Sequence, residues 1–522
     1  MTHDTDVLIV GGSLNGLTTA LLLARHGVRC IVVERHPDTT VQYKFAGISP
    51  RSMEIFRWAG IEQEIHASRT GDQKAGEIAR ARNLADPDLQ FMGRPWSDMD
   101  TLSVATAETC DQDVLEPILR RHAAAGGADI RFHTELVDFT QNEDGVQATI
   151  RDLESGEASR VFAQWMIAAD GVGGATRERL GIGRSGPGVL QHWMNLIFET
   201  DLEPFLQGRR FTSCFVSDIN ASVTPRPRRW LLSLQYRPDQ GESPEDFDAD
   251  RVRDLVRQAA GRQDVRVDLF DAREWAAAGF IADRFSHGRV FLLGDAAHSM
   301  PPTGGFGGNT GIHDAHNLAW KLAHVLNGRA DPALLDTYDV ERRHVAARTL
   351  AQALARLAAW FKDLSARLPP PEPIAPDANV IFGQHYPRGA LAQGADPPPS
   401  GFSNPFEPTG APGERAPHIW LADDRRALHD AIGDGFLLVS DSPAWIEAAG
   451  VAADRRGVTI ATYSPHGDSR DAWREKYGVS PDGAVLVRPD GFIGWRAVDA
   501  SGAPDQDLRG AFDRILGPAS PR

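Results

Sequence analysis

The stretch from residue 289 to residue 326 constrains the fold more than any other part of this chain. Its apolar residues 290–293 are typical of a buried parallel strand, and Asp295 follows at the edge where open α/β sheets hold their ligands. A loop rich in proline and glycine comes next, and apolar residues then recur at helical spacing: Ile312, Ala315, Leu318, Ala319, Leu322 and Leu326. This order of strand, acidic turn, loop and long helix predicts an α/β fold with a ligand beside the loop.

The loop itself suits close contact with a flat ligand. Its glycines carry no side chain, while Pro301 and Pro302 stiffen it and offer carbonyl groups but no N–H. The helix beginning near Asn309 turns its free N–H groups and the positive end of its dipole toward the loop. We expect Pro301, Pro302 and Gly305 to surround the reactive part of a bound ring. The wider cofactor-binding set expected here is Gly294, Asp295, Pro302, Gly305, Gly307, Gly308 and Asn309.

A second glycine turn lies near the start of the chain. The apolar run 7–10 is followed by Gly11, Gly12, Ser13, Leu14, Asn15 and Gly16, then by a helix over 17–25 and a strand over 30–33 that ends on Glu34. Such a βαβ unit places a pyrophosphate at a helix N-terminus and a ribose on the acidic residue. Ser13 replaces the usual second glycine, so we expect a shifted pyrophosphate contact. Glu34 favours FAD over NADPH at this site.

Together these motifs resemble those of the flavin-dependent aromatic hydroxylases, the family of para-hydroxybenzoate hydroxylase. The resemblance covers residues 4–350, with GDAAH, PPTGG and DAHNLAWKL in one run. It implies that Asp295 holds the ribityl chain of a non-covalent FAD. It also implies a monooxygenase in which NADPH or NADH binds transiently and reduces the flavin, O₂ adds to give a C4a-hydroperoxyflavin, and an aromatic carbon takes up its distal oxygen. A plain glycine-rich surface loop is the alternative for the glycines alone.

Further cofactor contacts follow from partial matches to the same family. The loop around residues 43–47 reads YKFAG where the polyketide branch often has Arg-Gly-x-Gly, and Asp170 with Gly171 and Arg177 resembles a third motif, with Gly174 in place of serine. The resemblance adds these residues to the expected site: Arg35, Lys44, Gly47, Gln112 and Asp170. The alternatives are a helix cap for Gln112 and a simple β-turn for Asp170. Arg51 could reach a phosphate or carboxylate, or could be a surface pairing residue.

The middle of the chain predicts a second sheet that covers an aromatic substrate. Strands are expected over 193–200, 211–217 and 230–236. The expected substrate-lining residues are Trp193, Asn195, Phe215, Tyr236 and Trp275, although each could equally be core. His192 and His298 are candidate acid–base groups, but an isolated histidine is more often structural.

The last part of the chain, from residue 436 onward, shows the order strand, helix, strand, helix, hairpin, helix, which resembles a thioredoxin fold. It contains no cysteine, so thiol chemistry is excluded there, and its expected role is structural. We therefore expect a Rossmann-like FAD-binding domain (1–75, 100–178 and 285–368) interleaved with a β-sheet substrate domain (76–99 and 179–284), a linker (369–413) and the tail (414–522). The protein is expected to be a monomer or a homodimer.

Composition narrows the function classes. The net charge of −16 argues against nucleic acid or an anionic membrane as partner. Three widely spaced cysteines indicate neither a disulfide framework nor a metal site, and no apolar run approaches the roughly 18 residues needed to span a bilayer. A cytoplasmic enzyme is expected.

For the reaction, the sequence favours hydroxylation of a neutral polycyclic phenol such as an aromatic polyketide intermediate, with O₂ as co-substrate. Baeyer–Villiger oxidation or epoxidation on the same fold is the close alternative. A flavin-dependent reductase or dehydrogenase, and a non-catalytic flavoprotein, remain as alternatives from other classes.

Overall fold

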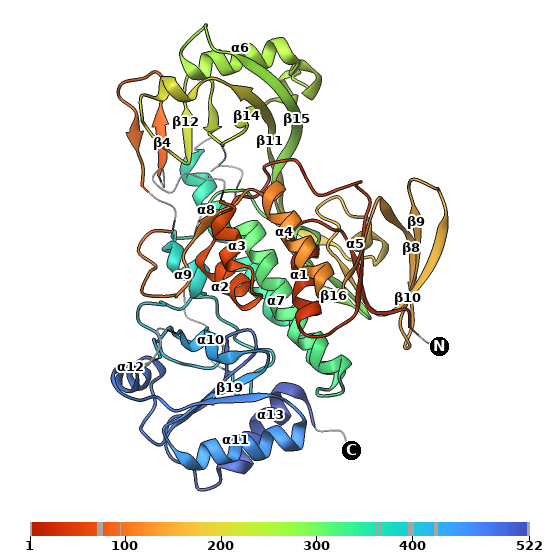
Figure 1. Ribbon diagram of the computed structural model, residues 1–522, viewed down its shortest axis with the longest axis vertical. Helices are drawn as coiled ribbons and strands as arrows, with labels where there is room; N and C mark the ends of the chain where they lie inside the picture. The colour runs from red at the N-terminus through yellow and green to blue at the C-terminus, as the bar shows by residue number, and fades with distance from the viewer. Residues whose placement is uncertain are drawn as a thin grey trace.

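The computed structural model describes residues 3–69, 77–93, 96–361, 364, 368, 370, 372–394, 401–421 and 426–518. In Figure 1 the chain forms three stacked parts. A β-sheet with helix α6 (Ala249–Ala260) lies at the top, a helix-rich part with its own sheet lies in the middle, and the C-terminal tail lies at the bottom. The predicted α/β class is confirmed.

The middle part is built on a mainly parallel sheet with the order β16-β17-β10-β1-β2-β7. The strands are β1 (Thr5–Val10), β2 (Cys30–Glu34), β7 (Asp129–Phe132), β10 (Ala158–Ala168), β16 (Ser286–His287) and β17 (Val290–Leu292). The hairpin β8 (Thr134–Gln141) and β9 (Val146–Asp152) extends it from β10. Continuous apolar runs explain the parallel strands, because both of their faces are covered.

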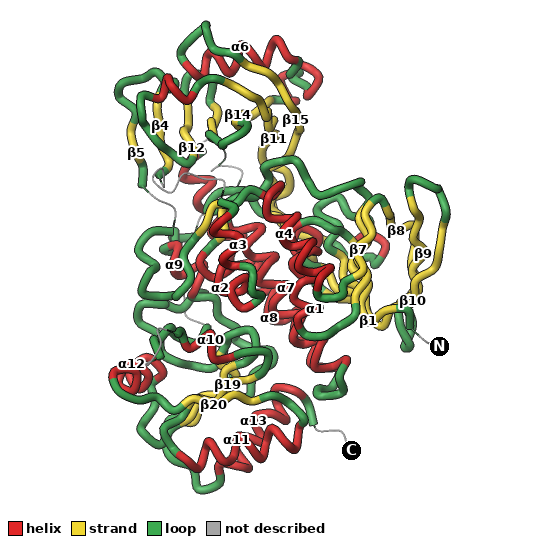
Figure 2. Tube along the Cα trace, viewed as in Figure 1, coloured by secondary structure: helices red, strands yellow, loops and turns green. Residues whose placement is uncertain are grey.

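Three helices cover one face of this sheet, as Figure 2 shows: α1 (Leu14–Arg25), α4 (Gln112–Ala125) and α7 (Phe306–Leu326). Their apolar residues share one core with β1 and β17. Further elements around them are β3 (Gly47–Ile48), β6 (Glu108–Thr109), α2 (Pro50–Trp58), α3 (Glu62–Ala67), α5 (Thr176–Arg179), α8 (Asp336–Trp360) and α9 (Asp377–Phe382). Among the described residues no helix is both long and apolar enough to cross a membrane.

The upper sheet has the order β18-β15-β11-β14-β13-β12-β4-β5. Its strands are β4 (Ile78–Ala81), β5 (Gln90–Phe91), β11 (Arg184–Thr200), β12 (Ser213–Val216), β13 (Ala221–Thr224), β14 (Trp230–Tyr236), β15 (Val267–Ala282) and β18 (His298–Ser299). The sequence located only the second half of β11, because Gly186, Pro187 and Gly188 resemble a strand end. These residues instead sit at a register shift within the strand.

The tail has a four-stranded sheet with the order β20-β19-β21-β22. Its elements are α10 (Leu428–Ile432), β19 (Phe436–Val439), α11 (Pro443–Arg456), β20 (Ile460–Tyr463), α12 (Asp468–Tyr477), β21 (Ala484–Val487), β22 (Ile493–Ala497) and α13 (Pro504–Leu516). From β19 onward this is the element order predicted from the sequence. Trp320 of α7 packs inside the core of the tail, so the tail is joined to the middle part. We propose the sequence-derived domain division for the folded chain.

Candidate active site

The first glycine turn joins β1 to α1. A Cβ atom on Gly16 would lie 1.8 Å from the carbonyl oxygen of Gly11, so only glycine fits there. The backbone N–H of Gly12 donates to Glu34 Oε2 at 2.7 Å, and the N–H of His36 donates to Glu34 Oε1 at 2.9 Å. The Glu34 carboxylate is thereby fixed beside the turn, in the position predicted for a ribose-binding acid.

Ser13 is anchored by a group that the sequence analysis missed. Its Oγ donates to Glu116 Oε1 at 2.5 Å, and Gln112 Nε2 donates to the same oxygen at 2.6 Å and to Ser13 Oγ at 2.9 Å. Two predicted site residues, Ser13 and Gln112, therefore meet on the buried carboxylate of Glu116. Its position four residues after Gln112 on one helical face was the available signal.

The two distant glycine turns touch each other. Gly294 has a left-handed φ of 59°, and a Cβ atom there would lie 2.2 Å from Asn15 Nδ2 of the first turn. The other end of that amide, Asn15 Oδ1, is buried and accepts no hydrogen bond from the described residues. The fold thus brings Asn15 against Gly294, and Asn15 Oδ1 is left without a hydrogen-bond donor among the described residues.

Asp295 and Asp170 add two more acceptors. The side chain of Asp295 is accessible, yet so much protein surrounds it that desolvation raises the pKa of its carboxyl, against the opposing charges of His298 and Lys44. Desolvation also raises the pKa of Asp170, whose Oδ2 accepts from the Thr176 hydroxyl at 2.8 Å. Asp170 Oδ1 is buried without a partner among the described residues.

This set of acceptors fits the cofactor implied by the sequence. A buried acceptor without a donor costs free energy, and a hydroxyl-rich chain such as the ribityl group of FAD supplies donors. Arg35 and Lys44 are exposed and act on Asp170 and Asp295 through their charges. The residues present therefore fit FAD.

The glycine loop closes the other side of the site. Gly305 is the N-cap residue of α7, and its N–H donates to the Pro302 carbonyl at 2.9 Å, so that carbonyl already accepts one hydrogen bond within the loop. Asn309 turns inward: its Nδ2 donates to the carbonyls of Gly305 at 2.8 Å and Gly47 at 3.0 Å. The Asn309 side chain therefore braces the loop, and only its backbone remains for the cofactor.

An aromatic residue that the sequence analysis missed lies against this loop. Cβ atoms on Gly47 and Gly305 would each lie 3.0 Å from Trp96. Gly308 packs closely on Phe45 and Leu14, and Gly307 lies near Met300. The predicted glycines thus meet around one space, and Trp96 had no motif or periodicity that could have revealed it.

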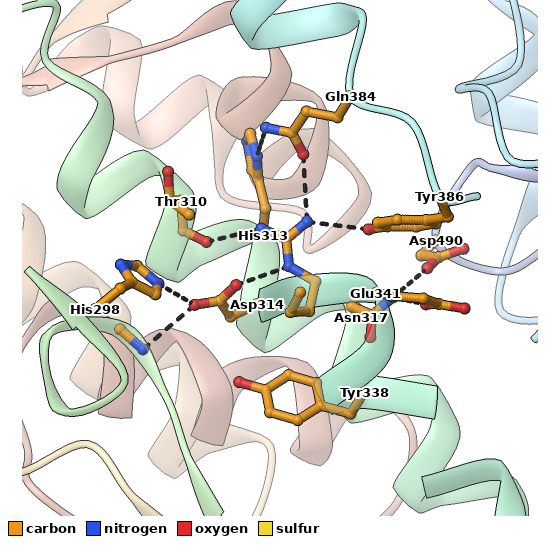
Figure 3. A network of polar contacts seen from close by, with 12 residues as sticks. His298, Thr310, His313, Asp314, Asn317, Tyr338, Glu341, Gln384, Tyr386 and Asp490 are labelled. Atoms are coloured by element: carbon orange, nitrogen blue, oxygen red, sulfur yellow. Dashed lines mark hydrogen bonds and ion pairs between the residues drawn. The ribbon is translucent and has the colours of Figure 1, made fainter. Parts of the chain in front are cut away.

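A buried ionic network supports the acidic turn (Figure 3). Asp314 of α7 accepts from His298 Nε2 at 2.7 Å and Arg342 Nε at 2.7 Å, and from the N–H of Gly294 at 3.3 Å. Burial acts to raise the pKa of Asp314, but Arg342 and His298 outweigh it and lower that pKa to about 2. His298 is thus a structural partner of Asp314, as expected for an isolated histidine. Arg51 is likewise structural, in a buried pair with Glu54.

The upper sheet has one face against α6 and one face turned away from it. Met194, Leu196, Leu232 and Leu234 pack with α6 in a common core, so the alternate residues of each strand belong to the opposite face. The predicted lining residues on this opposite face are Trp193, Asn195, Phe215 and Trp275. Trp193 and Trp275 stack there with ring centroids 5.6 Å apart and planes 15° apart.

Tyr236 lies on the wrong face for a substrate-lining residue. It belongs to the α6 core, and its hydroxyl donates to Glu274 at 2.7 Å. His192 contacts its ring on the same side. The prediction failed because strand boundaries alone do not reveal which alternate residues face the core. We remove Tyr236 from the substrate set.

Fold and site together define a flavoprotein whose second sheet leads, through β18, into the proline- and glycine-rich loop 301–308, called the flavin loop from here on. The known proteins agree. The family model for an FAD binding domain matches residues 4–353, and the model for the C-terminal domain of aromatic-ring hydroxylases matches residues 409–519. The chain belongs to this family of FAD-dependent aromatic-ring monooxygenases.

Individual relatives cover nearly the whole chain. Tetracenomycin B2 monooxygenase-dioxygenase of Streptomyces olivaceus is 38% identical over 98% of this chain and 98% of its own length. A 4-methyl-5-nitrocatechol 5-monooxygenase of a Burkholderia species is 36% identical over 98% of each. A crystal structure of aklavinone-11 hydroxylase with FAD and aklavinone matches with a TM-score of 0.92 at 35% identity, covering 99% of both chains.

Proposed function

We propose that this monooxygenase hydroxylates a polycyclic aromatic phenol of the polyketide type. One observation carries the proposal: the tryptophan pair on the face away from α6 has neutral amide and hydroxyl groups beside it, at Gln191, Asn195 and Ser233. A flat ligand with neutral oxygens is stabilised by such a surface. The tetracenomycin and aklavinone enzymes among the relatives support the same substrate class.

In this proposal the cofactor lies between the two glycine turns. Glu34 holds the ribose, the start of α1 receives the pyrophosphate, and Asn15, Asp170 and Asp295 accept hydrogen bonds from hydroxyl groups. When bound there, FAD would supply chemistry that side chains lack, namely electron transfer from NADH or NADPH and the activation of dioxygen.

The chain contributes orientation and shielding. The N–H groups at the start of α7 stabilise negative charge on the ring beside them. Pro301 and Pro302 have no N–H that could deliver a proton at the loop. Trp96, which covers Gly47 and Gly305, helps to exclude water. Because β18 pairs with β15 and leads directly into Pro301, a ligand on the upper sheet is held next to the loop.

The test is NAD(P)H oxidation by the purified yellow protein with a series of phenols under isotopically labelled dioxygen. We expect a polycyclic phenol to stimulate oxidation and to gain one labelled oxygen atom on an aromatic carbon. Oxygen inserted beside a carbonyl would identify a Baeyer–Villiger enzyme instead. Product formation without label would identify a reductase or dehydrogenase.

We further propose a cytoplasmic location, since all three cysteines are free and buried. Every group named in the site comes from one chain, so the proposal is compatible with a monomer or a homodimer.

A further inference from the structure

Two amide side chains on the substrate-facing side of β11 have their oxygen atoms already engaged. Trp193 Nε1 donates to Gln191 Oε1 at 3.3 Å. Trp275 Nε1 and Ser233 Oγ donate to Asn195 Oδ1 at 2.9 Å and 2.5 Å. An indole N–H is only a donor, so these bonds decide which end of each amide is the oxygen. The NH₂ group of each amide must therefore point away from its tryptophan.

Neither NH₂ group has a partner in the described part of the chain. Gln191 is 2% exposed, and its Nε2 is buried without a hydrogen bond. Asn195 is 8% exposed, and the only side-chain hydrogen bonds it makes there are the two that Oδ1 accepts, so its Nδ2 is free to donate but is not fully buried. A buried donor without an acceptor is costly, so a ligand oxygen at Gln191 Nε2 is favoured, and Asn195 Nδ2 is free to donate to a second ligand oxygen.

The two amides occupy different distances from the flavin loop. Gln191 pairs with Ala277, close to Phe280 and Ile281, where β15 meets β18 and the chain enters Pro301. Asn195 pairs with Arg273, four residues further along β11. At about 3.3 Å per residue, their α-carbons are about 13 Å apart, with Trp193 between them.

We infer that Gln191 and Asn195 determine substrate specificity by donating hydrogen bonds to oxygens at the two ends of a fused polycycle. This inference rests on the proposed function. Gln191 donates to an oxygen on the ring beside the flavin loop, and Asn195 donates to an oxygen on the ring farthest from that loop. The oxygens of a single benzene ring cannot reach both donors, whereas those of three or four linearly fused rings can. Neutral donors favour neutral carbonyl or hydroxyl oxygens.

The experiment uses two isosteric variants, Asn195→Asp and Gln191→Glu, which replace a donor by an acceptor and keep the oxygen bound to tryptophan. Binding to the oxidised holoenzyme is followed by the change in flavin absorbance, and KM and kcat are measured separately. The probes are a naphthacenequinone with hydroxyl groups on both terminal rings, and catechol. Glu274→Gln, on the opposite face, is the matched control.

We expect Asn195→Asp to weaken binding of the naphthacenequinone about tenfold or more and to leave catechol binding within about twofold. Gln191→Glu should weaken both ligands. The control should change neither. Equal binding of the naphthacenequinone by wild type and Asn195→Asp, or equal weakening of both ligands by Asn195→Asp, would overturn the inference.

A second measurement covers the case in which a variant does not retain FAD. Wild-type enzyme is titrated with the naphthacenequinone and with an analogue that lacks the oxygens of one terminal ring. A loss of about tenfold supports the inference, and no loss contradicts it. If the proposed function itself is wrong, the wild-type holoenzyme shows no flavin perturbation and no stimulated NAD(P)H oxidation with any phenol, which is a different result.

Discussion

Two regions of this molecule bury polar side chains, and they do so in opposite ways. Between α7, α8 and the tail, each charge is paired: Glu341 accepts from Lys321 at 2.7 Å and from both terminal nitrogens of Arg488. Around the glycine turns and on the face of the upper sheet away from α6, some buried polar atoms have no partner among the described residues: Asn15 Oδ1, Asp170 Oδ1 and Gln191 Nε2. Burial alone therefore does not mark a functional site here. Buried polar atoms without a partner among the described residues occur in both regions, for example Asn317 Oδ1 and Trp320 Nε1 in the first, so one such atom alone does not mark a site either. The indication of a ligand is that several of them, at Asn15 and Asp170, gather at the glycine turns.

The largest effect on stability is expected from removing one charge of the buried ionic network between α7, α8 and the tail. In Arg488→Gln, Glu341 and Asp490 lose a shared cation in a fully buried position. We expect a loss of about 3–5 kcal/mol in unfolding free energy, measured by urea denaturation. Arg509→Gln, which removes an exposed pairing with Asp513, is the control and should cost at most about 1 kcal/mol. Similar small losses in both variants would show that the network is not stabilising as a unit.

A second prediction concerns the carboxylate of Asp295, which is proposed to accept a hydrogen bond from FAD. Asp295→Asn should weaken FAD affinity about tenfold to a hundredfold, since a hydrogen bond to a charged acceptor contributes about 1.5–3 kcal/mol. Asp138→Asn, on an exposed strand residue, is the control. Titration of the protein with FAD, followed by flavin fluorescence, gives both affinities. Unchanged affinity in the Asp295 variant would remove this carboxylate from the cofactor site.

The raised pKa of Asp295 adds a pH dependence with a definite sign. Desolvation favours the protonated carboxyl in the free protein, whereas hydroxyl donors of FAD favour the carboxylate. FAD uptake should therefore release protons, and affinity should fall as the pH is lowered through the folded-state pKa. The Asp295→Asn variant should lack this dependence.

A smaller effect is expected on the α6 side of the upper sheet. Tyr236→Phe removes a hydrogen bond to Glu274 and should cost about 1 kcal/mol of stability. Substrate binding should stay unchanged, because the ring faces away from the site. Flavin-perturbation titration of the variant tests this, and weakened substrate binding would restore Tyr236 to the lining set.

The smallest effect concerns Asp113, a half-buried carboxyl whose Oδ1 has no partner among the described residues. Desolvation, followed by the charge of Asp111, raises its pKa from 3.8 to about 6. Because the folded pKa is above the unfolded one, this group lowers stability as the pH rises from 3.8 to about 6, and the loss then stays constant. Asp113→Asn should stabilise the protein by up to about 1 kcal/mol above that range, after allowance for solvent screening, and by nothing below it. Thermal unfolding across pH measures the difference.

The sequence predicted those parts of the molecule that depend on local pattern. Both glycine turns, Glu34 and the order of elements in the tail follow from short motifs and from hydrophobic periodicity. The packing of Asn15 on Gly294 joins residues far apart in the chain, and no local signal marks it. The same holds for Trp96 and for the pairing of Asp314 with Arg342. Tyr236 shows most clearly what the sequence could not predict. Its strand was placed correctly, but only the pairing register shows that its side chain lies on the α6 side of the sheet.

The position of Trp320 has a consequence for how this enzyme can be divided. The indole lies in the hydrophobic interior of the tail, while the same α7 begins at the flavin loop. A shortened gene product that stops before β19 would expose this ring to water and leave Lys321 and Glu341 without Arg488. The tail therefore stabilises the rest of the chain by covering α7. Deleting the tail should yield a fragment that aggregates rather than a smaller active enzyme.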